Sequence, residues 1–282
     1  MNGKILVVGS TGTVGQHLVK LLSDAGEQVL AASTSPQKVP ALPGVEPVRL
    51  DLKDAATYSA ALDGVDRIFL LSPTGALDTY ELLAPFIQQA VADRTRKIVF
   101  QTAIGVESSD DIPLRRVELL IEQSGAPYVH LRPNWFSDNF HSYWLDMVKA
   151  GVIALPTGDA RTSFIDARDI AASAAAVLQS ERFDCRAFTL TGSESLTYAE
   201  AAAILSEVLG RTVTHVDVDE EIFIKSSLAA GNPEERARQL AMLLHVVKLG
   251  YVAQVTPDVE ELTGRAPITV TQYARDYADR WS

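Results

Sequence analysis

The sequence predicts an α/β fold in which a doubly wound parallel sheet is accompanied by a smaller C-terminal α/β lobe. Two observations predict it. Short apolar segments alternate with helical patterns through the first half of the chain, which is typical of a parallel sheet with helices on both faces. After Arg132 and Pro133 this alternation is lost and helical patterns dominate.

The strands expected in the first half are short, apolar and bounded by glycine or polar residues. They cover residues 4–8, 28–32, 47–50, 66–71, 97–101 and 127–131. The helices between them follow the 3.6-residue apolar period. They cover residues 14 to about 26, 54–62, 78–92 and 114–123.

The second half predicts longer helices and isolated strands. The strands cover residues 162–165, 188–190 and 213–216, and the helices cover 139–150, 166–178, 198–209, 220–230, 233–249 and 270–281. Thr197 and Glu200 have the spacing of a capping box, which sets the start of the helix over 198–209. We therefore expect a dinucleotide-binding core over about 1–135 and 162–180. The smaller substrate lobe should cover about 136–161 and 185–282.

Composition narrows the function classes. The chain has 282 residues, of which 47% are hydrophobic and 22% charged, as in an ordinary soluble globular protein. Its 25 basic and 36 acidic residues give a net charge of −11, which argues against nucleic-acid binding. The single cysteine, Cys185, excludes an internal disulfide framework and fits a reducing compartment. No signal-peptide pattern follows Met1 and no apolar run reaches the ~18–20 residues of a membrane span, so we expect a cytoplasmic protein.

A glycine-rich turn joins the first strand to the first helix and predicts a nucleotide site. The stretch VVGSTGTVG places Gly9, Gly12 and Gly15 between them, and its flanking Thr11, Thr13 and Val14 belong to the same turn. The first glycine permits the tight turn, the second lets the backbone approach a pyrophosphate, and the third permits close packing of helix and strand. The start of the helix offers free N–H groups and a partial positive charge to the phosphates. We therefore expect a Rossmann fold with a bound dinucleotide.

Several segments resemble the NmrA-like group of atypical short-chain dehydrogenase/reductases. They are GSTGTVG at the first turn, Asp51-Leu52 after the third strand, SGAPY running into LRPNWF at residues 124–136, FIDARDIA at 164–171, and the segment from Leu190 to Glu200. The resemblance covers about residues 4–216. LRPNWFSDNF most resembles the reductases of this group, which include triphenylmethane and quinone reductases and iminium-reducing dehydrogenases of ergot alkaloid assembly.

The resemblance also implies where a cofactor lies. Asp51 and Leu52 would contact the adenine. The segment Leu71, Ser72 and Pro73 and the pair Thr102 and Ala103 would line the nicotinamide ribose, since they follow the fourth and fifth strands. Pro133 would lie behind the nicotinamide ring.

The end of the second strand indicates which dinucleotide is bound. An acid there would hold both ribose hydroxyls of NADH and repel a 2′-phosphate. This chain instead has Ser33, Thr34 and Ser35, followed by Lys38. Hydroxyls and an ammonium group suit a 2′-phosphate, so we expect NADPH, with NADH as the alternative. The NADP-binding members of the family usually have an arginine where Thr34 falls, and this chain departs from that pattern.

The expected acid of a dehydrogenase is missing. Short-chain dehydrogenases commonly use a Tyr-x-x-x-Lys pair to protonate a carbonyl oxygen as hydride arrives. The corresponding helix here reads IPLRRVELL, with neither tyrosine nor lysine, and Arg115 and Arg116 are expected on a solvated face. Two interpretations remain open. One is a reductase whose acceptor needs no protein acid, such as a quinone, an iminium ion or an enone. The other is a non-catalytic NAD(P) sensor acting through a protein partner.

Aromatic residues after Pro133 favour the reductase. Trp135, Phe136 and Tyr143, with the later Phe164, would form a wall for a flat, conjugated small-molecule substrate. His141 is a weak candidate for a catalytic acid. None of the histidines pairs with Cys or Glu at a metal-ligand spacing, so no metal site is expected. The sequence is compatible with a monomer or a homodimer.

Overall fold

The computed structural model describes residues 3–73, 75, 76 and 78–281, which group into two compact units. Unit 1 comprises the residues up to Pro133, Ala167–Leu190 and Glu261–Gly264. Unit 2 comprises Asn134–Asp166, Thr191–Glu260 and the residues from Arg265 on. The chain leaves unit 1 immediately after Pro133. Trp135 therefore follows the last residue of β6 by only two positions along the chain.

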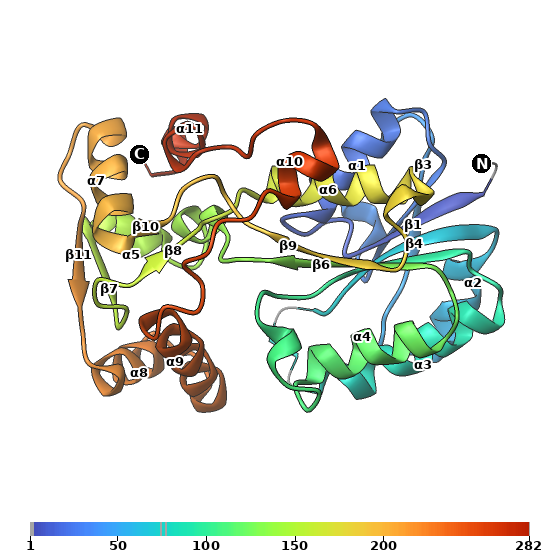
Figure 1. Cartoon of the computed structure of the whole chain (residues 1–282), viewed down its shortest axis with the longest axis horizontal. Coiled ribbons are helices and arrows are strands. Elements are labelled where there is room, and N and C mark those ends of the chain that lie inside the picture. Colours follow the sequence, from blue (N-terminus) through green and yellow to red (C-terminus); the bar gives the residue numbers. More distant parts are fainter. Residues whose placement is uncertain (1–2, 74, 77, 282) are drawn as a thin grey trace. The chain divides into compact units, whose positions relative to one another are not determined.

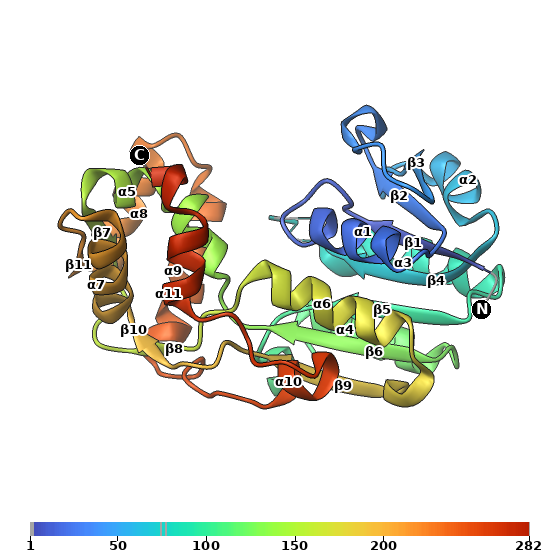
Figure 2. The ribbon, with the colours of Figure 1, turned by 90° about the horizontal axis from the view of Figure 1, so that it is seen from above.

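Unit 1 is built on a seven-stranded sheet with the order β3-β2-β1-β4-β5-β6-β9, and every neighbouring pair is parallel. The strands appear side by side in Figure 2. Their bounds are β1 (Lys4–Val8), β2 (Val29–Ser33), β3 (Val45–Arg49), β4 (Val65–Leu71), β5 (Lys97–Gln101), β6 (Tyr128–Pro133) and β9 (Arg186–Leu190). The order reverses at β1, which makes the carboxyl ends of β1 and β4 the point where ligands of such sheets bind. This confirms the predicted doubly wound sheet.

Helices cover both faces of this sheet (Figure 1). On one face lie α1 (Gly15–Asp24) and α6 (Ala167–Leu178), which pack against each other. On the other face lie α2 (Tyr58–Leu62), α3 (Thr79–Ala92) and α4 (Pro113–Gln123). Apolar side chains of this second group form one core with alternate residues of the strands, which include Ile98 and Phe100 of β5. The two-residue alternation along each strand therefore decides which face a side chain serves.

Unit 2 contains two small sheets and several helices. Strand β7 (Val152–Leu155) pairs parallel with β11 (Thr214–Asp217), and β8 (Arg161–Thr162) pairs antiparallel with β10 (Leu196–Thr197). The helices that lie wholly in this unit are α5 (Leu145–Ala150), α7 (Tyr198–Leu209), α8 (Glu220–Ala229), α9 (Glu234–Lys248) and α11 (Val270–Asp276). Helix α10 (Asp258–Thr263) spans the boundary between the units.

Some predicted elements begin and end at the observed residues, and others needed correction. Strand β5 and helix α7 match the predictions, and α7 has the capping box between Thr197 and Glu200. The helix expected over 139–150 is wrong: a turn over residues 142–144 separates a 3₁₀ turn at Ser137–His141 from α5, and the φ of −127° and ψ of −92° at Ser142 are not helical. The strand expected over 162–165 is limited to β8. Strand β9 had been placed in the smaller lobe but pairs with β6 in unit 1.

Buried cations hold the C-terminal end of α6 at the amino edge of the main sheet. Arg67 of β4 donates to the carbonyl oxygen of Leu178 at 3.0 Å. Lys97, the first residue of β5, donates from Nζ to the carbonyl oxygens of Val177 at 2.6 Å and Ser180 at 2.7 Å. Both side chains satisfy carbonyls that a helix end leaves unpaired, and their charge complements the helix dipole.

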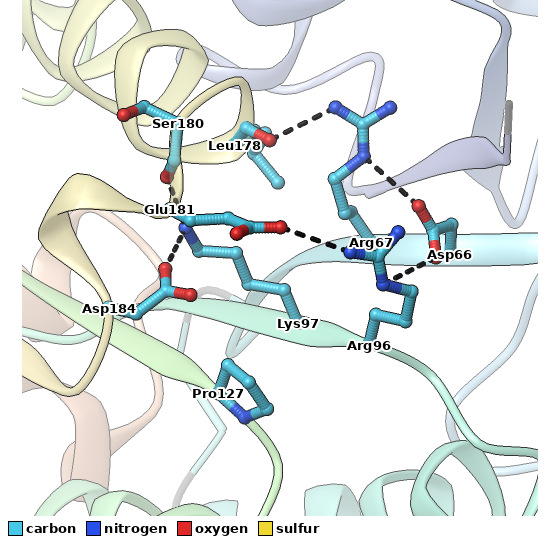
Figure 3. Close-up of a pocket in the computed structure, with 9 residues that line it drawn as sticks. All are labelled: Asp66, Arg67, Arg96, Lys97, Pro127, Leu178, Ser180, Glu181 and Asp184. Atoms are coloured by element: carbon cyan, nitrogen blue, oxygen red, sulfur yellow. Dashed lines mark hydrogen bonds and ion pairs between the residues drawn. The ribbon is translucent and has the colours of Figure 1, made fainter. Parts of the chain in front are cut away.

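These cations line a pocket of about 320 Å³ (Figure 3). Each cation has a carboxylate partner: Arg67 pairs with Glu27, Arg96 with Glu181, and Lys97 with Asp184. The pocket lies at the amino ends of β4 and β5, whereas the glycine turn follows the carboxyl end of β1. We therefore assign it to the fold and not to the nucleotide site. Among the described residues, no helix has the length and apolar character needed to cross a membrane.

Replacing the buried lysine should destabilise the protein. The substitution Lys97→Met leaves two carbonyl oxygens and the Asp184 carboxylate without their donor. We expect the free energy of unfolding in urea to fall by about 3–5 kcal/mol. The control is Lys20→Met, which breaks the exposed pair between Lys20 and Asp24 on α1 and should cost less than about 1 kcal/mol. Similar small losses in both variants would contradict the assigned role.

Candidate active site

The glycine turn has the geometry of a phosphate site. Gly9 has a φ of +72°, a conformation that side chains disfavour. A Cβ atom on Gly15 would lie 2.1 Å from the carbonyl oxygen of Gly9, so only glycine lets the helix start this close to the turn. A Cβ atom on the exposed Gly12 would meet only that same oxygen, at 3.2 Å. The first and third glycines thus build the turn, and the second leaves the backbone open to a ligand.

The start of α1 is free to receive an anion. Its N-cap position is Val14, no side chain caps the helix start, and no acidic residue lies in its first turn. Thr11, Gly12 and Thr13 are exposed. The hydroxyl group of Ser10 donates to the carbonyl oxygen of Ala32 at 2.9 Å and fixes the turn to β2. The exposed turn thus leads into a helix start whose dipole is compensated by neither a capping side chain nor a nearby acid, an arrangement that suits phosphate binding.

The end of β2 presents two polar side chains to solvent. The hydroxyl group of Ser33 is held inside the loop, 3.3 Å from that of Thr11, and accepts the backbone N–H of Ser35 at 3.1 Å. Thr34 and Lys38 are exposed. Of the residues predicted to meet a 2′-phosphate, Thr34 and Lys38 are thus accessible, whereas Ser33 shapes the loop.

The predicted adenine pair lies in the loop after β3. Asp51 accepts the backbone N–H of Lys53 at 3.0 Å through Oδ1. Leu52 is buried, and its carbonyl oxygen accepts the Tyr58 hydroxyl at 2.7 Å. This loop is therefore ordered by its own hydrogen bonds.

The predicted nicotinamide side lies at the carboxyl ends of β4, β5 and β6. Leu71, Gln101 and Leu131 are register partners across these strands. Leu71 and Ser72 are half-buried, and Pro73 is exposed. Thr102, the residue after β5, donates its backbone N–H to the carbonyl oxygen of Leu131 at 2.8 Å. The backbone N–H of Ile104 donates to the carbonyl oxygen of Pro133 at 3.0 Å. Ala103 is half-buried between them.

Helix α4, where the sequence analysis looked for a Tyr-Lys pair, carries a buried carboxylate. Helix α4 contains no tyrosine and no lysine. Its Glu118 is fully buried and accepts two hydrogen bonds from Arg132, at 3.0 and 2.7 Å, and one from Arg115 at 2.8 Å. It also accepts the Thr102 hydroxyl at 2.9 Å. Burial alone would raise the pKa of Glu118, but the hydrogen bonds from Arg132 and Arg115 hold that pKa below its usual range. Glu118 is therefore a carboxylate and not a proton donor.

One of the two arginines of α4 differs from expectation. Arg115 does not lie on a solvated face: its side chain is 17% exposed and also pairs with Glu122 at 2.7 Å. Arg116 is exposed and lies 4.1 Å over the Tyr80 ring. Sequence reasoning missed Glu118, although its position beside Val117 and three residues before Ile121 places it on the buried face of the helix.

A histidine completes this cluster. His130 is fully buried, and its Nε2 lies 3.3 Å from a carboxylate oxygen of Glu122. Glu118, Glu122 and His130 bring possible metal-ligand atoms within 4.8 Å of one another. Arg115 and Arg132 already neutralise these carboxylates, and their positive charges would repel a metal ion. The arrangement is that of an ion-pair network.

Several aromatic residues of unit 2 pack against one another in an aromatic cluster. The Trp135 ring is half-buried and stacks on Trp144, with ring centroids 5.9 Å apart. Trp144 packs against Phe140, and Phe140 packs against Phe164 at 5.2 Å. The Phe164 side chain is 1% exposed, so it belongs to the core of unit 2 and presents no ring face at the surface.

The other predicted substrate residues remain accessible. Phe136 is half-buried. Tyr143 is 59% exposed, and the Arg236 guanidinium lies 5.9 Å from the centre of its ring.

His141 is fixed within unit 2. Its Nδ1 lies 2.6 Å from the Tyr273 hydroxyl, and its ring stacks on Tyr277 at 4.5 Å. Burial lowers its pKa, and the nearby Arg280 acts in the same direction. A histidine that is neutral and hydrogen-bonded in this way is a weak proton donor.

Comparison with known proteins identifies the family. The chain matches the NmrA-like family over residues 1–262. It belongs to that family. It is 31% identical to the NAD(P)H azoreductase of Xenophilus azovorans over 280 residues, which cover 97% of this chain and 98% of that protein.

Solved structures share the fold of this NmrA-like protein. Triphenylmethane reductase of Citrobacter sp., solved with NADP(H), has a TM-score of 0.84 and 25% identity, covering 98% of this chain and 99% of that one. NmrA, a negative transcriptional regulator solved with NADP, has a TM-score of 0.78 and 18% identity, covering 98% and 95%. The NmrA-like protein thus has the dinucleotide-binding fold of NAD(P)H-dependent oxidoreductases.

The buried histidine should make stability of the NmrA-like protein depend on pH. Burial lowers the pKa of His130 to about 4, although Glu118 and Glu122 act in the opposite direction. Unfolded histidine has a pKa of about 6.5. Between pH 6.5 and 4 the unfolded chain therefore takes up a proton that the folded protein excludes, and stability is lost as the pH falls, by about 3 kcal/mol for this group.

The variant His130→Phe isolates this contribution. Phenylalanine suits the site because His130 stacks on Tyr128 and packs edge-on against Phe100. In urea denaturation at pH 7 and pH 4, the stability of wild type relative to the variant should fall by about 3 kcal/mol at the lower pH. A difference that stays constant between the two pH values would contradict the buried neutral state.

Proposed function

We propose that this protein is an NADPH-dependent reductase that transfers hydride to a flat, conjugated acceptor without a proton-donating residue. The observation that supports the proposal is the Glu118 ion-pair network on α4, the helix on which a Tyr-Lys pair was expected. Arginines paired with a buried carboxylate stay protonated and do not act as acids near neutral pH. The acceptor must therefore be one that accepts hydride readily and takes its proton from water.

The fit of the dinucleotide rests on the glycine turn and on β2. Gly12 and the open start of α1 would hold the pyrophosphate. Exposed Thr34 and Lys38 would meet the 2′-phosphate, and the absence of an acid at the end of β2 removes the group that selects NADH. Bound NADPH would supply a hydride from C4 of its nicotinamide.

The acceptor class is supported by the aromatic residues and by the relatives. Trp135 lies two residues after Pro133, so their Cα atoms are within about 7 Å of each other whatever the placement of the two units. Trp135, Phe136 and Tyr143 would stack on a conjugated acceptor and orient it. Phe164 would support this wall from the core, through Phe140 and Trp144. The names of the relatives, azoreductase and triphenylmethane reductase, refer to acceptors of this kind.

Cofactor choice is tested at Lys38. The variant Lys38→Ala removes the ammonium group facing the 2′-phosphate, so we expect the KM for NADPH to rise about 3- to 10-fold, as for a lost charge-assisted hydrogen bond. The KM for NADH should not change, because NADH has no 2′-phosphate. Steady-state kinetics with both cofactors measures this. An equal change for the two cofactors, or a wild-type preference for NADH, would contradict the NADPH assignment.

The reaction class is tested by turnover. The protein is mixed with NADPH and a panel of quinones, azo dyes, cyclic imines and enones, and oxidation of the cofactor is followed at 340 nm. We expect turnover with at least one acceptor. Trp135→Ala should lower kcat/KM about tenfold with the Kd for NADPH unchanged, because the ring orients the acceptor only. The control Tyr251→Ala removes an aromatic ring that is 70% exposed and lies outside the aromatic cluster.

A different result supports the other candidate. NADPH binding without turnover across the panel would overturn the reductase proposal. It would favour a non-catalytic regulator that binds the nucleotide; NmrA, which was solved with NADP, is a negative transcriptional regulator.

A further inference from the structure

Two neighbouring polar residues lie at the carboxyl end of β5: Gln101 is its last residue and Thr102 follows it. Among the described residues, only the Thr102 side chain of this pair has a hydrogen bond that serves the fold. Side chains alternate between the faces of a strand. Ile98 and Phe100 belong to the core beneath α3 and α4, so Thr102 faces α4, where its hydroxyl donates to Glu118. Gln101 faces the opposite side of the sheet.

The carbonyl oxygen of the Gln101 side chain is buried and has no hydrogen-bond partner among the described residues. Buried acceptors in folded proteins are nearly always paired with a protein group, a water molecule or a ligand. The neighbouring Thr102 shows the usual case, since its hydroxyl proton is held by Glu118. The described part of the fold therefore supplies no hydrogen-bond donor to Oε1 of Gln101.

The position of Gln101 points to the missing donor. It lies at the carboxyl edge of the sheet, in register with Leu71 and Leu131. Strand β5 is separated from β1 by β4, on the side away from β2, so it stands about 10 Å from β1. A dinucleotide with its pyrophosphate at the start of α1 and its adenosine toward β2 would extend its other half along this direction. That half carries ribose hydroxyls and a carboxamide N–H₂, which are hydrogen-bond donors.

We infer that Oε1 of Gln101 accepts a hydrogen bond from the nicotinamide nucleoside half of NADPH, and that the Thr102 hydroxyl serves the fold through Glu118. This assignment rests on the proposed function. It makes Gln101 a binding residue whose side-chain oxygen accepts a hydrogen bond from the cofactor. The sequence signal for it is slight: a glutamine closes the otherwise apolar strand KIVFQ.

The test compares the Gln101→Leu variant with the wild type in three measurements: the Kd for NADPH, the Kd for 2′,5′-ADP, and the stability of the free protein. The Kd for NADPH should rise about 2- to 10-fold, the usual effect of one lost hydrogen bond. The Kd for 2′,5′-ADP, which lacks the nicotinamide half, should stay at the wild-type value. Stability of the free protein in urea should stay equal or rise, because no internal hydrogen bond is lost. Gln101→Met, with an unbranched apolar side chain of similar length, provides a second variant if leucine does not fit.

Thr102→Val is the matched control. It removes the donor from one oxygen of Glu118, so the free protein should lose stability. The assignment is overturned if Gln101→Leu binds NADPH as tightly as wild type, if both ligands are weakened equally, or if the free protein loses stability as Thr102→Val does. Failure of the wild type to bind NADPH would instead overturn the proposed function, and this assignment with it.

Discussion

The hydrogen bonds to the Glu118 carboxylate are the interaction on which the candidate active site depends. They join α4 to the ends of β5 and β6 through Thr102 and Arg132, and they occupy both carboxylate oxygens. A buried carboxylate is costly unless it is paired and hydrogen-bonded. Removing any one donor would therefore disturb the edge of the sheet at which the nucleotide is proposed to bind.

This network also limits the chemistry. Helix α4 carries ion pairs between arginines and the buried Glu118 carboxylate, and under the proposed function these ion pairs occupy the place of a catalytic acid. Catalysis would then come from holding cofactor and acceptor in position and from excluding water around them, and the acceptor would provide the electronic driving force. The exposed Tyr143 and the half-buried Trp135 are the side chains best suited to such orientation, because rigid rings bind flat molecules with little loss of conformational entropy.

Much of the fold could be predicted because local signals were strong. The apolar run of β5 and the capping box of α7 each determine an element over a few residues, and the three glycines identify the first turn. Features that depend on tertiary contacts were missed. The helical period over 139–150 is interrupted at Ser142 because the chain there follows the packing of Phe140 and Trp144.

Site residues were harder to predict for the same reason. Phe164 was expected in the aromatic wall for the substrate, but the core of unit 2 encloses it. The partners of Glu118 are Thr102, just after β5, and Arg132 on β6. They lie 16 and 14 residues away in sequence, beyond any helical spacing. A role for Gln101 could not be predicted from the sequence, because it depends on the hydrogen-bond partners of buried side-chain oxygens in the folded protein.

The most direct measurement of the central claim is transfer of deuterium from cofactor to product. The protein would be incubated with NADPH labelled with deuterium at C4, separately in each stereochemical position, and with a cyclic imine or enone from the turnover panel. Direct hydride transfer predicts one deuterium bound to carbon in the product from one of the two labelled cofactors, with the added proton drawn from water. Product without deuterium from either cofactor, or cofactor that binds and is never oxidised, would contradict the account.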